Sequence, residues 1–302
     1  KEIINSFKWL GVEFDEETVY QSHNQDRHVE VALELLEKGL AYVCTCSKER
    51  LEELRNQQQE EGLNPKYDSK CRNLSLNRTS GSVIRFKIPD SDSTVFNDLV
   101  KGEVRVENKE LDDFIILRSD GTPTYNLSVV VDDIDMGISH VIRGEEWLPS
   151  APLHVLLYDA LNWERPKFAH LPLLLRPDGN GKLSKRDGDR LGFPVFPLDW
   201  TTIDGELYSG YREKGYFPEA FINMLAFLGW NPGTQQEIFS LKELSDAYSL
   251  ERVSKGGAKV DPDKTKWFQQ QYIRATNAED LAKMLENHFP PGFSHSEKVT
   301  IC

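Results

Sequence analysis

Hydrophobic positions recur at helical spacing at the start of the chain. Ile3, Phe7 and Leu10 would share one face of a helix, and Gly11 is suited to end it. The same spacing predicts a second helix over residues 26–38. A polar helix that begins after Ser47 and extends to about residue 61 should follow, since serine is a favoured helix cap. The chain is therefore expected to open with helices.

The pattern then changes to alternation. Residues 83–88 and 102–107 alternate apolar and polar side chains, which is typical of half-buried strands. Residues 114–117 are apolar throughout and predict a buried strand, with a turn at Asp120 and Gly121. Residues 40–44 indicate a short strand or turn. This region is expected to mix helix and strand.

Helical and strand patterns alternate from Tyr125 onward. An apolar segment at 125–135 precedes a predicted buried parallel strand at 139–143, an amphipathic helix at 149–161 and another buried strand at 171–175. Such alternation predicts an α/β fold with a doubly wound parallel sheet. Beyond residue 218 the spacing predicts mostly helices: 218–228, one opened by the capping box Ser240–Glu243, and 277–285.

Size and charge narrow the classes of function. The chain has 302 residues, which favours two or three domains. A formal net charge of −13 argues against a protein that coats nucleic acid in general, but a local basic patch could still bind one RNA. The sequence has no run of about 18 apolar residues and no basic-then-apolar opening segment, so we expect no membrane and a cytoplasmic location.

A short basic stretch is the strongest candidate for chemistry. Residues 182–186 read KLSKR and follow the turn Pro177–Gly181. Ammonium and guanidinium groups on a loop suit the oxygens of a polyphosphate, and the glycines at 179, 181 and 188 would let that loop close. Taken alone, the stretch would more often be an exposed turn.

Three further motifs precede this loop in a fixed order. They are Gly121–Tyr125, Val129–Asp133 and His140–Trp147. Together with the lysine loop, this ordered set resembles the glutamyl-tRNA synthetases of class I, in which the loop is the KMSKS signature. The resemblance extends over nearly the whole chain. It implies the ATP-dependent attachment of glutamate to tRNA-Glu through a glutamyl-adenylate, with Mg²⁺ arriving on ATP.

The resemblance also assigns residues to roles. Positive charge on the phosphates would come from Lys182, Lys185 and Arg186. Arg143, at the end of a predicted strand, would pair with a substrate carboxylate, and Tyr125 would shape the glutamate site. ATP would contact Trp147, Leu174, Leu183 and Lys185.

These assignments have structural alternatives. Arg143 could instead pair with Glu145 or Glu146, and the aromatic and leucine side chains could be core residues. Asp132 and Asp133 are adjacent on a predicted helix, so they point in different directions and suit hydrogen bonding better than a shared metal ion.

The cysteines form a second constellation. Cys44 and Cys46 are followed, after a 24-residue gap, by Cys71, and this spacing resembles the zinc knob of some bacterial glutamyl-type enzymes. Thiolates suit Zn²⁺, which needs a fourth ligand. Relatives with the knob use a histidine, here replaced by Asn73, or a tyrosine, here Tyr67. The resemblance therefore implies a site of Cys44, Cys46, Tyr67 and Cys71; three ordinary cysteines in a degenerate site are the alternative.

The family pattern also implies a domain order. Residues 1–36 would end the first half of a Rossmann catalytic domain, and 37–116 would form an α+β insertion that binds the acceptor end of tRNA. Residues 117–167 would be the second Rossmann half, 168–275 a helical stem-contact region with the lysine loop, and 276–302 the start of an anticodon-binding domain. The parallel sheet would be incomplete, because the HIGH and R-x-E-D-T-D segments of the family are not in this sequence. We therefore expect an internal piece of a longer, monomeric protein, inactive or nearly so by itself.

Other functions fit the same chemistry less well. A paralogue that glutamylates the queuosine base of tRNA usually lacks an intact lysine signature and the helical extension, and this chain has both. A glutaminyl-tRNA synthetase would continue into β-barrels, whereas residues 210–220 and 267–274 lead into helices. A tRNA-binding fragment without catalysis is the remaining alternative.

Overall fold

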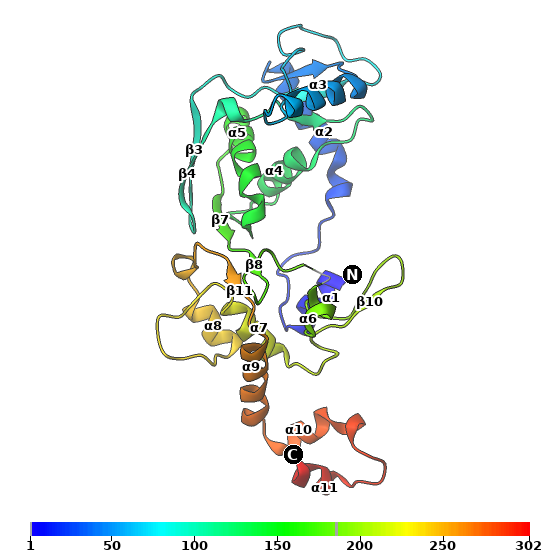
Figure 1. Cartoon of the computed structure of the whole chain (residues 1–302), viewed down its shortest axis with the longest axis vertical. Coiled ribbons are helices and arrows are strands. Elements are labelled where there is room, and N and C mark those ends of the chain that lie inside the picture. Colours follow the sequence, from blue (N-terminus) through cyan, green and yellow to red (C-terminus); the bar gives the residue numbers. More distant parts are fainter. Residues whose placement is uncertain (1, 185–186) are drawn as a thin grey trace. The chain divides into compact units, whose positions relative to one another are not determined.

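The structure is a computed structural model that describes residues 2–184 and 187–302, apart from the side chains at positions 189 and 287. Its contacts divide the chain into two compact units (Figure 1). One consists of Glu16–His170, and the other joins residues 1–15 to residues 171–302. The two units are described separately.

A three-stranded antiparallel sheet forms one part of the Glu16–His170 unit. Its order is β1 (Ala41–Cys44), β2 (Val83–Phe86), β5 (Ile115–Leu117), with Ala41 opposite Phe86. Helix α3 (Lys48–Glu60) follows β1, and the Ser47 hydroxyl accepts a hydrogen bond from the Arg50 N–H. The strands and the capped helix expected here are confirmed.

The second sheet of this unit has the order β4-β3-β7-β6. The strands are β3 (Ser93–Asp98), β4 (Gly102–Glu107), β6 (His140–Gly144) and β7 (Lys167–Leu171). Strand β3 pairs antiparallel with β4 and parallel with β7. Helices α4 (Tyr125–Asp135) and α5 (Ala151–Leu161) alternate with β6 and β7 along the chain, so the α/β class is confirmed.

Two predicted buried strands differ from the structure. In β6 only Val141 is buried, because β6 is at the edge of its sheet. The strand expected at 171–175 is interrupted: β7 ends at Leu171, and β8 (Leu174–Leu175) joins another sheet. Pro172 lies between them and has no N–H to donate to a strand neighbour.

Helix α2 (Gln25–Glu37) packs on α4 over an apolar core, after the short 3₁₀ helix η1 (Gln21–Asn24). The Asp132 carboxylate on α4 accepts hydrogen bonds from Gln21 and Asn24 and lies 2.7 Å from Nε2 of His28. The hydrogen-bonding role expected for Asp132 is confirmed. The core of this unit includes Val31, Leu35, Ile84, Phe86, Leu127 and Tyr158.

The other unit is mainly helical. Its helices are α1 (Glu2–Trp9), α6 (Asp187–Leu191), α7 (Pro218–Ala226), α8 (Leu241–Ala247), α9 (Pro262–Ala275), α10 (Ala278–Met284) and α11 (His295–Ile301). Short strands pair as β9 (Trp200–Thr201) with β10 (Leu207–Tyr208), and as β8 with β11 (Ala258–Lys259). The capping box at Ser240 and Glu243 forms as expected. The remaining 3₁₀ helices of the chain are η2 (Asn108–Glu110), η3 (Glu145–Ser150), η4 (Leu250–Arg252) and η5 (Glu286–His288).

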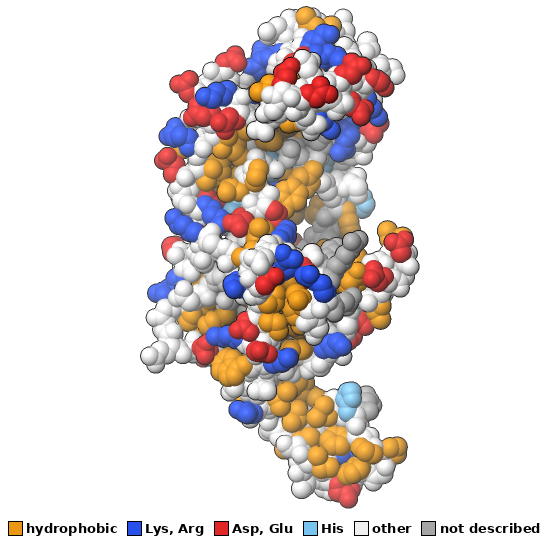
Figure 2. All heavy atoms as spheres, in the orientation of Figure 1, with side chains coloured by type: hydrophobic (Ala, Val, Ile, Leu, Met, Phe, Trp, Pro, Cys, Tyr) orange, Lys and Arg blue, Asp and Glu red, His pale blue; other side chains and the backbone are white. Residues whose placement is uncertain are grey.

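The surface carries both acidic and basic side chains. On the face drawn in Figure 2, basic and acidic side chains are interspersed around α3. The net charge therefore does not take the form of one uniformly acidic surface in this view. Among the described residues, no helix is long and apolar enough to cross a membrane.

A buried carboxylate joins the two parallel strands of the second sheet. Asp98 Oδ1 accepts hydrogen bonds from the backbone N–H groups of Val100 at 3.0 Å, Lys101 at 2.8 Å and His170 at 3.2 Å. Its Oδ2 lies 2.6 Å from Nδ1 of His170. Burial favours the neutral acid, but these hydrogen bonds outweigh burial and lower the pKa of Asp98.

We predict that Asp98→Asn lowers the free energy of unfolding by about 2–3 kcal/mol at pH 7. Because the folded-state pKa lies below the unfolded value, the stabilisation is present above the unfolded pKa of about 3.9 and is lost as pH falls toward the folded pKa. Urea unfolding of parent and variant between pH 7 and 3 measures the difference. A gap that stays constant over this range would contradict the assignment.

Candidate functional site

Three of the residues predicted for the substrate site lie together in the Glu16–His170 unit. Arg143 is near the end of β6, Tyr125 begins α4, and Trp147 lies in η3. The guanidinium carbon of Arg143 is 5.8 Å from the ring centroid of Tyr125 and 5.9 Å from that of Trp147. The two ring centroids are 5.1 Å apart. Both aromatic rings thus lie near the same guanidinium group.

One nitrogen of the Arg143 side chain lacks a hydrogen-bond partner. Its Nη1 is buried and has no hydrogen-bond partner within the described part of the chain. There Arg143 pairs with neither Glu145 nor Glu146, and Glu145 instead forms an ion pair with Lys101. A buried guanidinium nitrogen without an acceptor costs free energy that a bound anion would recover. The structural alternative for Arg143 is therefore not observed.

Two titratable groups interact electrostatically with Arg143. Burial, followed by the charge of Arg143, lowers the pKa of His154 to about 3, so this imidazole is neutral at pH 7. His154 lies 3.1 Å through Nε2 from Oδ1 of Asn126. Burial raises the pKa of Asp133, while Arg143 opposes that rise. The surroundings of Arg143 thus include a neutral histidine and the carboxyl group of Asp133.

Sequence reasoning missed His154 and Asn126. His154 is on a helix whose spacing indicates only packing, and Asn126 follows Tyr125 without a motif of its own. Only the packing of α4 against α5 brings the two together.

The lysine loop belongs to the other unit. Leu183 donates its backbone N–H to the carbonyl of Leu174 at 2.7 Å, and Lys182 bridges to Leu175. The two predicted adenine contacts, Leu174 and Leu183, are therefore neighbours. Lys185 and Arg186 lie outside the described residues.

Two of the three glycines predicted to let the loop close lie in the turn before it, and the third lies in α6. Gly179 and Gly181 have φ values of 78° and 96°, which favour glycine. Gly188, predicted to help the loop close, lies instead within α6, where a Cβ would be 2.9 Å from the carbonyl oxygen of Phe193. Close packing explains that glycine. Sequence reasoning also missed Lys259, which β11 places beside the turn: a Cβ on Gly179 would be 3.3 Å from its Nζ.

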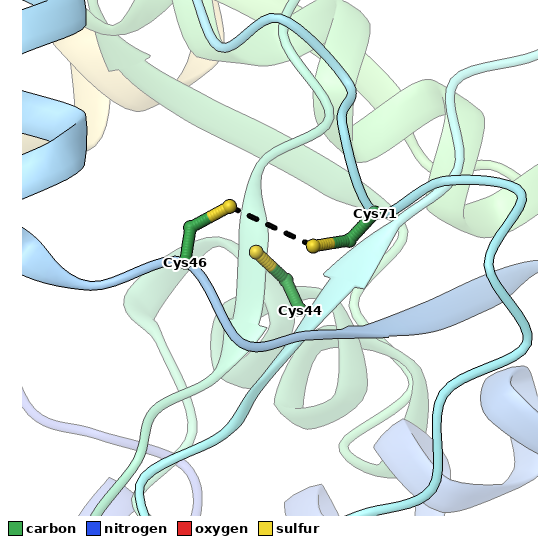
Figure 3. A group of neighbouring side chains, drawn as sticks. All are labelled: Cys44, Cys46 and Cys71. Carbon is green, nitrogen blue, oxygen red and sulfur yellow. Dashed lines mark hydrogen bonds between the residues drawn. The ribbon is translucent and has the colours of Figure 1, made fainter.

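The three predicted thiol ligands gather at one point in the Glu16–His170 unit. Figure 3 shows the sulfur atoms of Cys44, Cys46 and Cys71 directed toward one another. All three lie within 4.8 Å of each other, and the Sγ atoms of Cys46 and Cys71 are 3.6 Å apart. Tyr67 joins them, with its hydroxyl 3.3 Å from Sγ of Cys44 and 3.6 Å from that of Cys46.

Thiolates suit a soft dication, although burial raises the pKa of Cys46 and of Tyr67. Burial opposes ionisation of Cys71, but hydrogen bonding from the backbone of Thr45 and from the Tyr67 hydroxyl lowers the pKa of its thiol to about 7. The Tyr67 hydroxyl also accepts a hydrogen bond from the backbone N–H of Cys71 at 3.0 Å. Three sulfurs and a phenol oxygen supply four donor atoms, which is the number of ligands in a tetrahedral site. The predicted four residues are thus brought together.

Comparison with known proteins identifies the family. Residues 1–267 match the sequence model of the class I tRNA synthetases (E and Q), catalytic domain. The chain belongs to this family.

Named relatives agree with the family. The chain is 48% identical to a glutamate–tRNA ligase of Flavobacterium johnsoniae and 45% identical to one of Christiangramia forsetii. Both matches cover 99% of this chain, which spans only 64% of the length of each relative.

A solved structure extends the similarity to the fold. A glutamate tRNA ligase of Elizabethkingia meningosepticum, crystallised in complex with its amino acid, matches with a TM-score of 0.92 and 39% identity. The match covers 99% of this chain and 65% of that one. The class I synthetase resemblance expected from the motifs is confirmed.

We predict that Arg143→Met changes the free energy of unfolding by less than about 1 kcal/mol when no substrate is present. The variant loses weak contacts with two rings and the charge interaction with Asp133, but it also removes a buried guanidinium nitrogen without an acceptor. Urea unfolding of parent and variant measures the change. A loss above about 2 kcal/mol would instead show that Arg143 holds the fold together.

Proposed function

We propose that the full-length protein containing this chain attaches glutamate to tRNA-Glu, using ATP and a glutamyl-adenylate intermediate. The family and the named relatives support this activity. The observation that carries it is the buried, unpartnered Nη1 of Arg143 between two aromatic rings. This group needs an anion.

The charge of Arg143 favours glutamate over glutamine, and the family includes ligases for both. A side-chain carboxylate would accept a charge-assisted hydrogen bond from Nη1, whereas the amide oxygen of glutamine would accept a weaker one. The hydroxyl of Tyr125 can add a hydrogen bond to the same substrate. We therefore favour glutamate over glutamine as the substrate.

The first chemical step then follows from positioning. The side-chain carboxylate of glutamate would pair with Arg143, which leaves the α-carboxylate free to attack the α-phosphorus of ATP. The bond from this phosphorus to the bridging oxygen breaks, and pyrophosphate leaves. Lys182, Lys185 and Arg186 would stabilise negative charge on the phosphate oxygens. Mg²⁺ would be held mainly by the phosphates of ATP.

The other predicted residues would bind ATP. Leu174 and Leu183 would hold the adenine, and Trp147 would contact ATP beside the amino acid. The terminal hydroxyl of tRNA-Glu would then attack the activated carbonyl and release AMP. As a participant in translation, the protein is expected to act in the cytoplasm as a monomer.

The assay for this proposal is glutamate-dependent exchange of pyrophosphate into ATP with tRNA-Glu, performed on the full-length protein. We predict that Arg143→Ala and Lys185→Ala each lower kcat/KM about 100-fold or more, because each removes a charge that contacts substrate. Lys242→Ala is the control, since Lys242 is an exposed lysine on α8.

The pattern of outcomes separates the functions. Exchange that depends on glutamine instead would indicate a glutaminyl enzyme. A parent that folds and binds tRNA but shows no exchange would support the binding-only alternative.

We also propose that Cys44, Cys46, Tyr67 and Cys71 hold a structural Zn²⁺. Bound there, zinc would join the end of β1 to the loop that carries Cys71. The gathering of the three sulfurs and the phenol oxygen supports this set.

For the metal we predict that Cys71→Ser loses zinc stoichiometry while Cys302→Ser retains it, because Cys302 is an exposed cysteine at the end of the chain. Elemental analysis of the purified proteins after dialysis measures the bound metal. Equal zinc in Cys71→Ser and the parent would rule out this ligand set.

A further inference from the structure

A guanidinium group contacts the cysteine cluster, by which we mean Cys44, Cys46, Tyr67 and Cys71. Nη1 of Arg50, on α3, lies 3.6 Å from Sγ of Cys46. The same nitrogen donates to Oδ1 of Asp68 at 3.3 Å, and Nη2 donates to the other carboxylate oxygen. Two parallel hydrogen bonds hold a guanidinium in a defined orientation. Arg50 is thus aimed at one of the sulfurs.

A second guanidinium contacts the cluster through its aromatic member. The guanidinium carbon of Arg85, on β2, lies 3.8 Å from the ring centroid of Tyr67. Arg85 is only 6% exposed, and its Nη1 donates to the backbone oxygen of Asp113 at 2.7 Å. Its Nε is buried without a hydrogen-bond partner in the described part of the chain. The side chain is therefore packed against the ring.

The charge of the cluster explains two arginines at this place. Three thiolates around a dication leave a net negative charge, and such a charge is costly where the surroundings are buried. Cys44 and Cys71 are buried, at 2% and 3% exposure. Permanent positive charges nearby lower that cost, and neighbours outside the ligand shell commonly tune metal affinity.

We propose that Arg50 and Arg85 are positioning residues that raise the affinity of the cysteine cluster for a dication. Arg50 does so through its hydrogen bond to the Cys46 sulfur, and Arg85 through its charge and by holding the Tyr67 ring. This inference rests on the proposed metal site. A purely structural role makes a different prediction: an exposed Arg50–Asp68 pair would contribute little to stability and nothing to metal affinity.

The test measures the zinc dissociation constant of the purified chain by competition with a chromophoric chelator. Arg50→Gln should bind zinc about tenfold more weakly than the parent. Arg165→Gln is the matched control, because Arg165 also donates two hydrogen bonds to one carboxylate of the same unit, from Nε and Nη2 to Asp159. Its affinity should equal that of the parent.

Arg85 is tested by a pair of variants that separate charge from packing. Arg85→Met should lose at least tenfold in zinc affinity, whereas Arg85→Lys, which keeps the charge, should retain most of it. Binding of Co²⁺, whose absorption reports sulfur ligation, checks that the ligands are unchanged. If Arg85→Met fails to fold, Arg50→Gln decides the proposal alone.

The outcomes distinguish the existence of the metal site from the effect of the two arginines on its affinity. A parent that binds no zinc overturns the metal site and this inference with it. A parent that binds zinc, with Arg50→Gln binding equally well, overturns the inference and leaves the site intact. Equal loss in Arg85→Met and Arg85→Lys would overturn the role of the Arg85 charge.

Discussion

The second sheet of the Glu16–His170 unit depends on the buried carboxylate of Asp98. Strand β3 belongs to a hairpin with β4, and it reaches β7 through a short parallel contact at Asp98 and Phe168. A contact that short would hold two segments about 70 residues apart only weakly. Asp98 strengthens it, because one side chain accepts hydrogen bonds from its own turn and from His170. The hairpin is thereby joined to the strands that carry the candidate site.

At the candidate site, by contrast, a buried polar atom has no hydrogen-bond partner. Asp98 is surrounded by donors, whereas Nη1 of Arg143 has no acceptor within the described residues. Proteins satisfy buried polar groups as a rule, so this exception beside two aromatic rings supports the proposed anion site. The neutral imidazole of His154 contributes no competing charge. The cysteine cluster resembles Asp98 in this respect, because two guanidinium groups lie next to its expected negative charge.

Local patterns predicted much of the secondary structure. Ser47 and Ser240 cap helices where their positions indicated, because a cap depends only on the next few residues. The strand expected at 171–175 was wrong, since hydrophobic content alone did not account for Pro172. The role expected for Gly188 was also wrong, because the close approach of Phe193 cannot be seen in a short sequence window.

The sequence by itself determined the spacing of the helices, the order of the four motifs and the spacing of the cysteines, all of which depend on neighbouring residues. It thereby indicated the family, and it predicted a role for Arg143 and a set of metal ligands. Only the tertiary structure decided that Nη1 of Arg143 is unpartnered, that His154 lies near it, and that Arg85 packs on Tyr67. The physical reason is that partners and burial depend on segments far apart in the chain, whose approach is set by packing rather than by local preference.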